Sequence, residues 1–127
     1  MEELKLSVVV TAYNKQNTLE KCINSILNST FKDFELIIVE DKSTDNTIEV
    51  IEKFTDSRIK VIKHEVNLGA GLSRRDGIKA SKGKFVSLID GDDYIDKDFL
   101  EALIKRQEET NADIVSGGIT NINKDDT

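Results

Sequence analysis

The sequence has no proline and no tryptophan, and its 127 residues include one cysteine and one histidine. Cys22 therefore cannot form an internal disulfide, and its place in an apolar helical pattern favours a position in the core. His64 has no cysteine or second histidine with which to share a metal. We expect it to be a residue of a surface loop.

Long apolar runs are also missing. No run approaches the roughly 20 residues that a membrane-spanning helix needs, and the first five residues lack the apolar segment of a signal peptide. We therefore expect a cytoplasmic chain without a transmembrane segment, while leaving open that a longer protein containing it associates with a membrane.

Basic residues are fewer than acidic ones. The sequence has 18 Lys and Arg against 24 Asp and Glu, which gives a net charge of -6. Because a field of this sign repels nucleic acid, we expect no nucleic-acid partner. A phosphate ligand would have to be held locally by a metal, an arginine or backbone amides. With 38% hydrophobic and 33% charged residues, the chain is typical of one folded domain.

Strand and helix patterns alternate along the chain, without an internal repeat or a linker. Apolar, β-branched runs predict strands, and apolar residues at helical spacing predict helices. Ser43 or Thr44 is expected to cap the second helix, and Asp96 the last. We expect strands over residues 6–12, 34–39, 59–62, 85–89 and 114–116, and helices over 18–27, 48–54, 71–81 and 99–104.

Repeated βαβ units predict an α/β fold with a mostly parallel central sheet, in a Rossmann-like three-layer α/β/α arrangement. If the fourth strand crosses to the far side of the first, the core strand order is 3-2-1-4. The switch point then lies between strands one and four, where sheets of this kind bind ligands. This order would bring residues 11–14 beside residues 90–92.

The acidic cluster Asp90-Gly91-Asp92-Asp93 follows the apolar run at 85–89 and is the strongest chemical signal. Two carboxylates about 5 Å apart repel by about 3 kcal/mol at an effective dielectric near 20. A divalent cation such as Mg²⁺ or Mn²⁺, which prefers oxygen ligands, reverses that cost. Asp90 and Asp92 therefore predict a metal that holds a phosphate-bearing ligand.

Two other loops add complementary groups. Thr11 and Tyr13 could contact a planar base, the tyrosine by stacking, and Asp41 could accept a hydrogen bond from the edge of that base. The glycine-rich segment 67–77 lets backbone approach a ligand, and Arg74 or Arg75 could pair with a diphosphate.

In this order and spacing, the motifs resemble those of the inverting glycosyltransferases of family two, which have the GT-A fold and use nucleotide-diphosphate sugars. The resemblance runs over essentially the whole chain. It is carried by Ser7-Val8-Val9-Val10-Thr11-Ala12-Tyr13-Asn14, Val39-Glu40-Asp41-Lys42-Ser43-Thr44-Asp45, Asn67-Leu68-Gly69 and Leu88-Ile89-Asp90-Gly91-Asp92-Asp93.

The resemblance implies a role for each matching residue. Asp90-Gly91-Asp92 corresponds to the DXD motif, with Asp92 as the direct metal ligand and Asp90 facing the ribose or the waters of the metal. The role of Asp93 stays open. Arg74 would approach the phosphates. The residues expected to bind the nucleotide part of the donor, usually a UDP-sugar, are Thr11, Ala12, Tyr13, Asn14 and Asp41.

The same resemblance implies a metal-assisted hexosyltransferase that transfers sugar to a saccharide or lipid-linked acceptor, as in cell-surface polysaccharide synthesis. The family's general base lies in a later segment, so the catalytic base is expected beyond Thr127. Residues 1–127 are accordingly expected to be a single donor-binding domain, truncated before the acceptor-binding part. Glu40 and Lys42 stand where the family often has Asp and Gly, and Lys42 could alter its loop.

Two other functions are alternatives to glycosyl transfer. A phospho-receiver domain needs paired acids after strand one, an isolated Asp after strand three and a Lys after strand five, and the sequence fails at all three places. A non-catalytic nucleotide-sugar binding module stays open, because no general base is visible in this sequence.

Overall fold

The computed structural model describes residues 4–110. It forms a four-stranded sheet in the order β3-β2-β1-β4, and every neighbouring pair of strands is parallel. The expected strand order is thus confirmed, while the strand expected over 114–116 and the last residue, Thr127, lie outside the described residues. The elements are β1 (Leu6–Ala12), α1 (Leu19–Leu27), β2 (Phe34–Glu40), α2 (Thr47–Glu52), β3 (Ile59–Lys63), α3 (Ala70–Ala80), β4 (Phe85–Asp90) and α4 (Phe99–Thr110).

The two central strands explain why the chain forms this sheet. All seven residues of β1 and all seven of β2 are buried, as expected for strands that are covered on both faces. At the sheet edges, β4 alternates between buried and half-buried residues, and most residues of β3 are exposed to solvent. The apolar runs of the sequence therefore mark the middle of the sheet.

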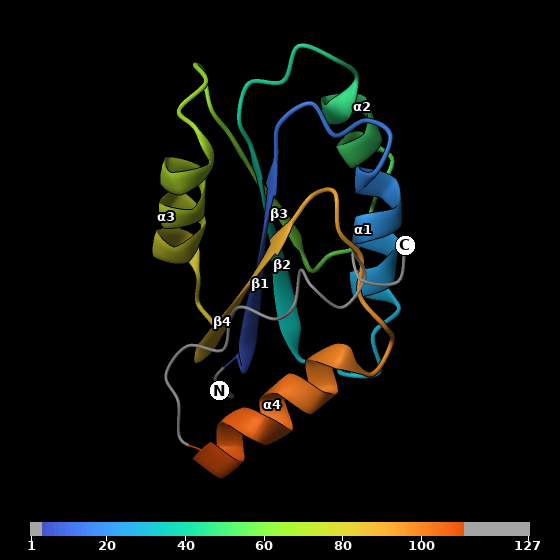
Figure 1. The fold of residues 1–127 in the computed structure, drawn as a ribbon, viewed down its shortest axis with the longest axis vertical. Coiled ribbons are helices and arrows are strands. Elements are labelled where there is room, and N and C mark those ends of the chain that lie inside the picture. The colour runs from blue at the N-terminus through green and yellow to red at the C-terminus, as the bar shows by residue number, and fades with distance from the viewer. Residues whose placement is uncertain (1–3, 111–127) are drawn as a thin grey trace.

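Helices cover both faces of the sheet (Figure 1). On one face, α1, α2 and α4 enclose the larger core cluster, which includes Cys22, Ile23 and Leu100. On the other face, α3 packs over a smaller cluster of Val9, Ile37 and Val39. Cys22 is fully buried, as the sequence predicts. Within residues 4–110, no helix is both long and apolar enough to span a bilayer.

The strand register brings the expected site residues together. Thr11 of β1 is paired with Asp90 of β4, and Ala12 is paired with Glu40 of β2. Backbone hydrogen bonds continue this pairing beyond the strands, from Gly91 N to the Thr11 carbonyl at 2.9 Å and from Asp41 N to the Ala12 carbonyl at 3.0 Å. The loops after β1, β2 and β4 therefore meet at the carboxyl edge of the sheet.

The start of the second helix differs from the prediction. Helix α2 begins at Thr47, and no side chain of its cap residue Asn46 closes it. Instead, Asp45 Oδ1 accepts a hydrogen bond from Thr47 N at 2.9 Å. Ser43 and Thr44 are not the caps because they bond to Asn14 of the first loop. A tertiary contact thus occupies Ser43 and Thr44, and the local capping bond comes from Asp45 instead.

Candidate functional site

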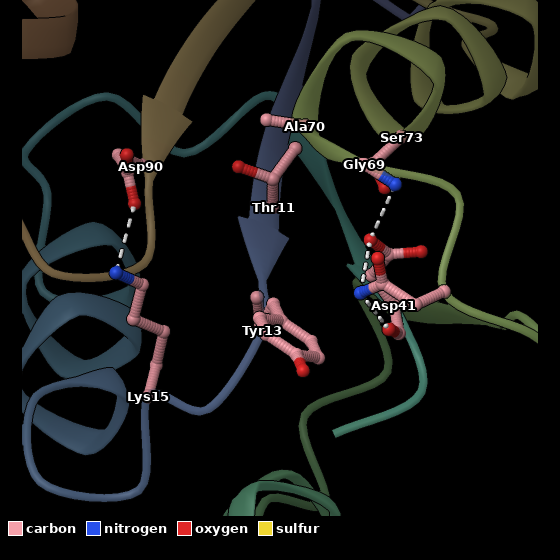
Figure 2. Close-up of a pocket in the computed structure, with 10 residues that line it drawn as sticks. Thr11, Tyr13, Lys15, Asp41, Gly69, Ala70, Ser73 and Asp90 are labelled. Atoms are coloured by element: carbon pink, nitrogen blue, oxygen red, sulfur yellow. Dashed lines mark hydrogen bonds and ion pairs between the residues drawn. The ribbon is translucent and has the colours of Figure 1, made fainter. Parts of the chain in front are cut away.

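A cavity of about 260 Å³ opens at the carboxyl edge of the sheet. Ligand pockets that enclose a drug-sized molecule start at about 300 Å³, so this cavity suits part of a larger ligand. Figure 2 shows Asp90 and Lys15 on one side of Thr11 and Tyr13, and Asp41 with Gly69 on the other. The lining residues are Thr11, Ala12, Tyr13, Lys15, Asp41, Asn67, Gly69, Ala70, Ser73 and Asp90.

The end of β1 and the loop that follows it supply the aromatic wall of the cavity. Thr11 and Ala12 are buried at the end of β1, whereas the Tyr13 side chain is 43% exposed. An exposed ring beside a cavity leaves a face on which a flat ligand can stack. The structure thus places Thr11, Ala12 and Tyr13 on the wall of the cavity, and their role in binding a nucleotide base stays a prediction.

Asn14 does not line the cavity. It has a φ of 54°, a left-handed conformation that Asn tolerates better than most residues. Its Oδ1 accepts a hydrogen bond from Thr44 N at 2.8 Å, and its own N–H donates to Ser43 Oγ at 2.9 Å. In this structure Asn14 thus ties the loop after β1 to the loop after β2.

The acidic cluster divides into exposed and buried carboxylates. Asp92 is exposed, and Asp90 is half-buried on the cavity wall. Asp93 is 2% exposed, and its N–H donates to the Asp90 carbonyl at 3.0 Å. Asp90 and Asp92 are therefore the cluster's accessible carboxylates, and Asp93 lies inside the turn that presents them.

Lys15 faces both accessible carboxylates. Its Nζ lies 3.9 Å from Asp90 Oδ1 and 3.4 Å from Asp92 Oδ2. A lysine ammonium in this position shows that the two acids attract a cation, although such partly exposed pairs contribute little to stability. The sequence prediction missed Lys15, even though it lies on the same loop as Tyr13.

The donor set fits a divalent cation that completes its shell elsewhere. Among residues 4–110, no group of three or more His, Cys, Asp or Glu side chains is arranged to hold a metal. Asp90 and Asp92 would supply two carboxylates, and Mg²⁺ in particular is held in many enzymes by one or two carboxylates plus phosphates and water. The residues present therefore match a metal that arrives with a phosphate ligand.

Asp41 is the most heavily bonded group of the site. Its Oδ1 accepts from Leu68 N at 2.8 Å and contacts His64 Nδ1 at 2.7 Å. Its Oδ2 accepts from Gly69 N at 2.9 Å and from Asn67 Nδ2 at 3.0 Å. A carboxylate offers about four lone-pair sites, so Asp41 is saturated here, and its expected bond to a base stays a prediction that needs one of these donors to move.

The pKa of Asp41 reflects this network. Burial acts to raise the pKa, but the hydrogen bonds from Leu68, His64 and Gly69, together with the charge of His64, outweigh it and hold the pKa below its ordinary value. Asp41 is therefore ionised at neutral pH.

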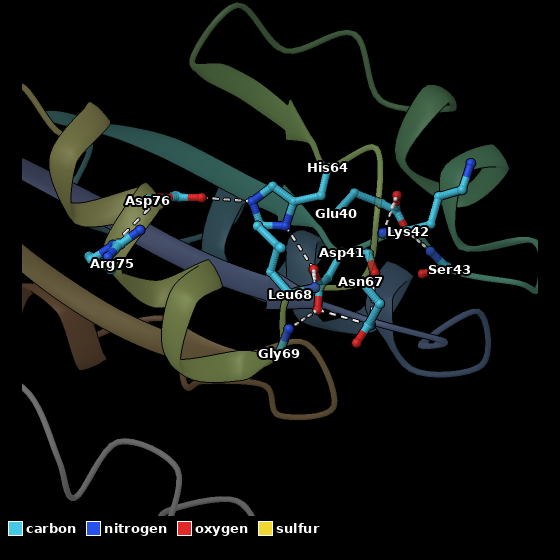
Figure 3. A network of polar contacts seen from close by, with 10 residues as sticks. All are labelled: Glu40, Asp41, Lys42, Ser43, His64, Asn67, Leu68, Gly69, Arg75 and Asp76. Atoms are coloured by element: carbon cyan, nitrogen blue, oxygen red, sulfur yellow. Dashed lines mark hydrogen bonds and ion pairs between the residues drawn. The ribbon is translucent and has the colours of Figure 1, made fainter.

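His64 corrects the sequence prediction of a surface loop residue. Its side chain is 7% exposed, and its ring lies between Asp41 and Asp76, with Nε2 at 2.8 Å from Asp76 Oδ2 (Figure 3). This ring can be buried because each of its two nitrogens has a carboxylate as hydrogen-bond partner. No local pattern reveals this contact, since its partners come from the end of β2 and from α3.

Helix α3 delivers fewer charges to the cavity than expected. Arg74 and Arg75 are exposed and are not among the lining residues, and Arg75 Nε lies 3.9 Å from Asp76 Oδ1. The phosphate contact of Arg74 stays a prediction. Ser73, which the sequence prediction missed, is 1% exposed, lines the cavity, and has an Oγ without a hydrogen-bond partner among the described residues.

The turn that precedes α3 explains the need for glycine in this loop. Gly69 has a φ of 95°, which side-chain-bearing residues rarely adopt.

Lys42, in the loop after β2, also has a positive φ of 61°. Glu40 supports this turn by accepting hydrogen bonds from Lys42 N at 3.2 Å and Ser43 N at 2.6 Å. The two departures from the family pattern thus lie in one turn.

A family model described as Glycosyl transferase family 2 matches residues 7–127. Two curated proteins of Streptococcus pneumoniae serotype 4 are similar along nearly the whole chain. Glycosyltransferase GlyA is 38% identical over 122 residues, which is 94% of this chain and 17% of GlyA. Glycosyltransferase GlyG is 36% identical over 128 residues, which is 99% of this chain and 42% of GlyG. The chain thus spans less than half the length of either protein.

The solved structures agree with this similarity. The S. aureus TarS fragment 1–349 in complex with UDP-GlcNAc superposes with a TM-score of 0.79 at 34% identity, covering 84% of this chain and 32% of that fragment. Another crystal structure of the same fragment gives a TM-score of 0.78, also at 34% identity, and covers 84% of this chain and 33% of that fragment. The parallel sheet is therefore that of the GT-A glycosyltransferases.

Proposed function

Because this chain belongs to glycosyl transferase family 2, we propose that it holds the nucleotide-diphosphate sugar, most simply a UDP-sugar, for a metal-assisted transfer with inversion. The observation that carries the proposal is the cavity itself. An exposed Tyr13 ring, a buried Asp41 and the accessible Asp90 border one opening at the switch point of a parallel sheet, which is where such folds bind nucleotides. The UDP-GlcNAc complex of TarS supports the choice of base.

We assign the base and the diphosphate to opposite sides of this cavity. The base would stack on Tyr13, next to the turn at residues 67–69 that Asp41 holds. The diphosphate would lie toward Asp90 and Asp92, where Lys15 already supplies positive charge. The small cavity volume then accommodates the base and ribose, with the sugar extending outward.

Asp90 and Asp92 are the residues that would hold Mg²⁺ or Mn²⁺. When bound, such a cation stabilises the negative charge that develops on the departing nucleotide diphosphate. Lys15 would have to leave the carboxylates, and its Nζ could then pair with a phosphate oxygen on the same side. As the acceptor hydroxyl attacks the anomeric carbon from the face opposite the diphosphate, the bond from that carbon to the diphosphate oxygen breaks, the nucleoside diphosphate leaves and the configuration inverts. The hydroxyl proton passes to a general base.

We further propose that residues 1–127 form the donor half of a larger enzyme. The chain spans 17% and 42% of two similar glycosyltransferases, so the proton acceptor for the incoming hydroxyl and the acceptor site would come from other parts of such a protein. The position of the catalytic base beyond Thr127 stays a prediction, because no comparison identifies that residue. The saccharide or lipid-linked nature of the acceptor and the cytoplasmic location stay predictions too.

Calorimetric titration of UDP with and without Mn²⁺ tests this proposal. We expect Mn²⁺ to strengthen UDP binding by about tenfold or more, which is about 1.4 kcal/mol. Asp92→Asn should remove that gain and leave metal-free binding little changed. Asp98→Asn, at an exposed position in the next turn, is the matched control and should behave as the parent. Equal affinity of the parent in both conditions would contradict the metal assignment, and the absence of any UDP binding would contradict the function.

A further inference from the structure

His64 joins three elements around the base side of the cavity. It follows β3 directly, and its backbone N–H donates to the Glu40 carbonyl at the end of β2 with a distance of 2.9 Å. Its ring lies 2.7 Å from Asp41 Oδ1 and 2.8 Å from Asp76 Oδ2 of α3. The ring therefore fills the space between a loop and a helix that are otherwise distant in sequence (Figure 3).

Both ring nitrogens face carboxylate oxygens, and this defines the protonation state that fits. An ionised carboxylate only accepts hydrogen bonds, whereas a neutral imidazole has one donor and a protonated imidazole has two. Only the imidazolium can donate to Asp41 and Asp76 at the same time. Loss of one proton would leave a ring lone pair against one of the two carboxylates.

The contact with Asp41 continues to the cavity wall. The same Asp41 carboxylate holds Leu68 N, Gly69 N and the Asn67 side chain. Asn67 and Gly69 line the cavity, and Gly69 precedes the first turn of α3. A shift of Asp41 would therefore change the shape of the cavity at residues 67–69.

We propose that His64 is a positioning residue for the nucleotide cavity: its protonated ring clamps Asp41 to Asp76 and so fixes the turn at residues 67–69. The part of this inference that concerns UDP rests on the proposed function, while the part that concerns the turn does not. Because neither ring nitrogen would contact substrate, the role of His64 is exerted through Asp41.

The charges around the ring determine how the clamp depends on pH. The groups that face it are Asp41 from the end of β2 and Asp76 from α3, and Arg75 lies beside the other oxygen of Asp76. The hydrogen bond to Asp41 raises the pKa of His64, burial opposes this, and Asp76 raises the pKa further. A pKa raised in the folded state means that the clamp is complete below the ordinary value near 6.5 and is lost as pH rises through the raised pKa.

NMR spectroscopy tests the clamp without any ligand, because a chain with a single histidine gives ring signals that need no assignment by mutation. We expect the His64 ring to titrate above the ordinary value, and the amide signals of Leu68 and Gly69 to shift with the same midpoint. Asp76→Asn should lower that midpoint. Glu65→Gln, which removes an exposed carboxylate next to His64 in sequence, should leave it unchanged.

Calorimetric titration of UDP at several pH values adds the functional readout. We expect the affinity of the parent to fall by about tenfold above the His64 midpoint, and the Asp76→Asn profile to move to lower pH. A ring that titrates at its ordinary value, amides that do not follow it, or a pH profile that Asp76→Asn does not move would overturn the inference. If the parent fails to bind UDP at any pH, the proposed function fails, and the amide shifts alone decide the clamp.

Discussion

Replacement of Asp41 by asparagine would remove the carboxylate that connects the end of β2 to His64 and to the turn at residues 67–69. The structure places two donors on each oxygen: His64 and Leu68 N on Oδ1, and Asn67 and Gly69 N on Oδ2. An asparagine side chain keeps one acceptor oxygen and places an NH₂ group where the other was. With the NH₂ group toward Asn67 and Gly69 N, two donors lose their acceptor; with the NH₂ group toward His64, Leu68 N loses its acceptor and the His64 ring keeps a partner only as a neutral imidazole that accepts at Nδ1.

The structure sets the size of the effect. Hydrogen bonds to charged groups contribute about 1.5–3 kcal/mol each, so two lost bonds give an upper range near 6 kcal/mol. Because Asn67 and Leu68 are exposed and can bond to water instead, we expect the lower end, about 3 kcal/mol of unfolding free energy. With a urea slope of about 2 kcal/mol per M, the midpoint should fall by about 1.5 M.

Urea unfolding followed by circular dichroism at pH 6 is the assay, with the exposed Asp33→Asn as the matched control. The pKa of Asp41 is depressed in the fold, so its contribution is present above the ordinary value near 3.9 and is lost as pH falls through the lowered pKa. The difference between parent and Asp41→Asn should therefore shrink in acid. A difference under about 0.5 kcal/mol at pH 6, which is the scatter of neutral surface substitutions, would refute the network.

Further substitutions test the packing of α3 on the sheet and the contribution of the buried Glu35 carboxylate. Gly77→Ala should destabilise the fold by about 1–2 kcal/mol, because an added Cβ overlaps Val9 Cγ1 and overpacking outweighs the helix preference for Ala. Gly71→Ala, whose added Cβ would have nothing within 4 Å, should instead stabilise the fold by about 0.5 kcal/mol. Equal effects of the two substitutions in thermal unfolding would contradict this packing. Glu35→Gln should cost about 1–2 kcal/mol in urea, because this buried carboxylate accepts bonds from Ser7, Lys60 and Lys82. Burial acts to raise the Glu35 pKa, but these bonds lower it overall, so the cost should fade in acid, and a pH-independent cost would exclude the ionic contribution.

The sheet could be predicted from sequence because each central strand contains an apolar run, residues 8–10 in β1 and residues 36–39 in β2. Leu6–Ala12 and Phe34–Glu40 are buried throughout, and the rule of right-handed crossovers leaves few ways to order the strands. Asp90 and Tyr13 could be placed for a related reason, since each lies at a strand end whose position the order determines.

His64 and the start of α2 could not be predicted in this way. The partners of His64 are 23 and 12 residues away in sequence, and they meet only once α3 has packed on the sheet. Ser43 and Thr44 are both good helix caps, and only the contact with Asn14 removes them from that role. In both cases a long-range hydrogen bond decides between local options that the sequence leaves equivalent.

An NMR titration of the ¹⁵N-labelled chain with UDP and Mg²⁺ tests most directly whether this cavity is the donor site. Proline is the residue that lacks a backbone N–H, and the sequence has none, so no amide signal is missing because of a proline. We predict that the largest shifts fall on the amides of Thr11, Ala12 and Gly69, which line the cavity, while Glu35 and Lys82 at the opposite edge stay unchanged. Shifts centred on that opposite edge, or spread evenly over both, would contradict the assignment.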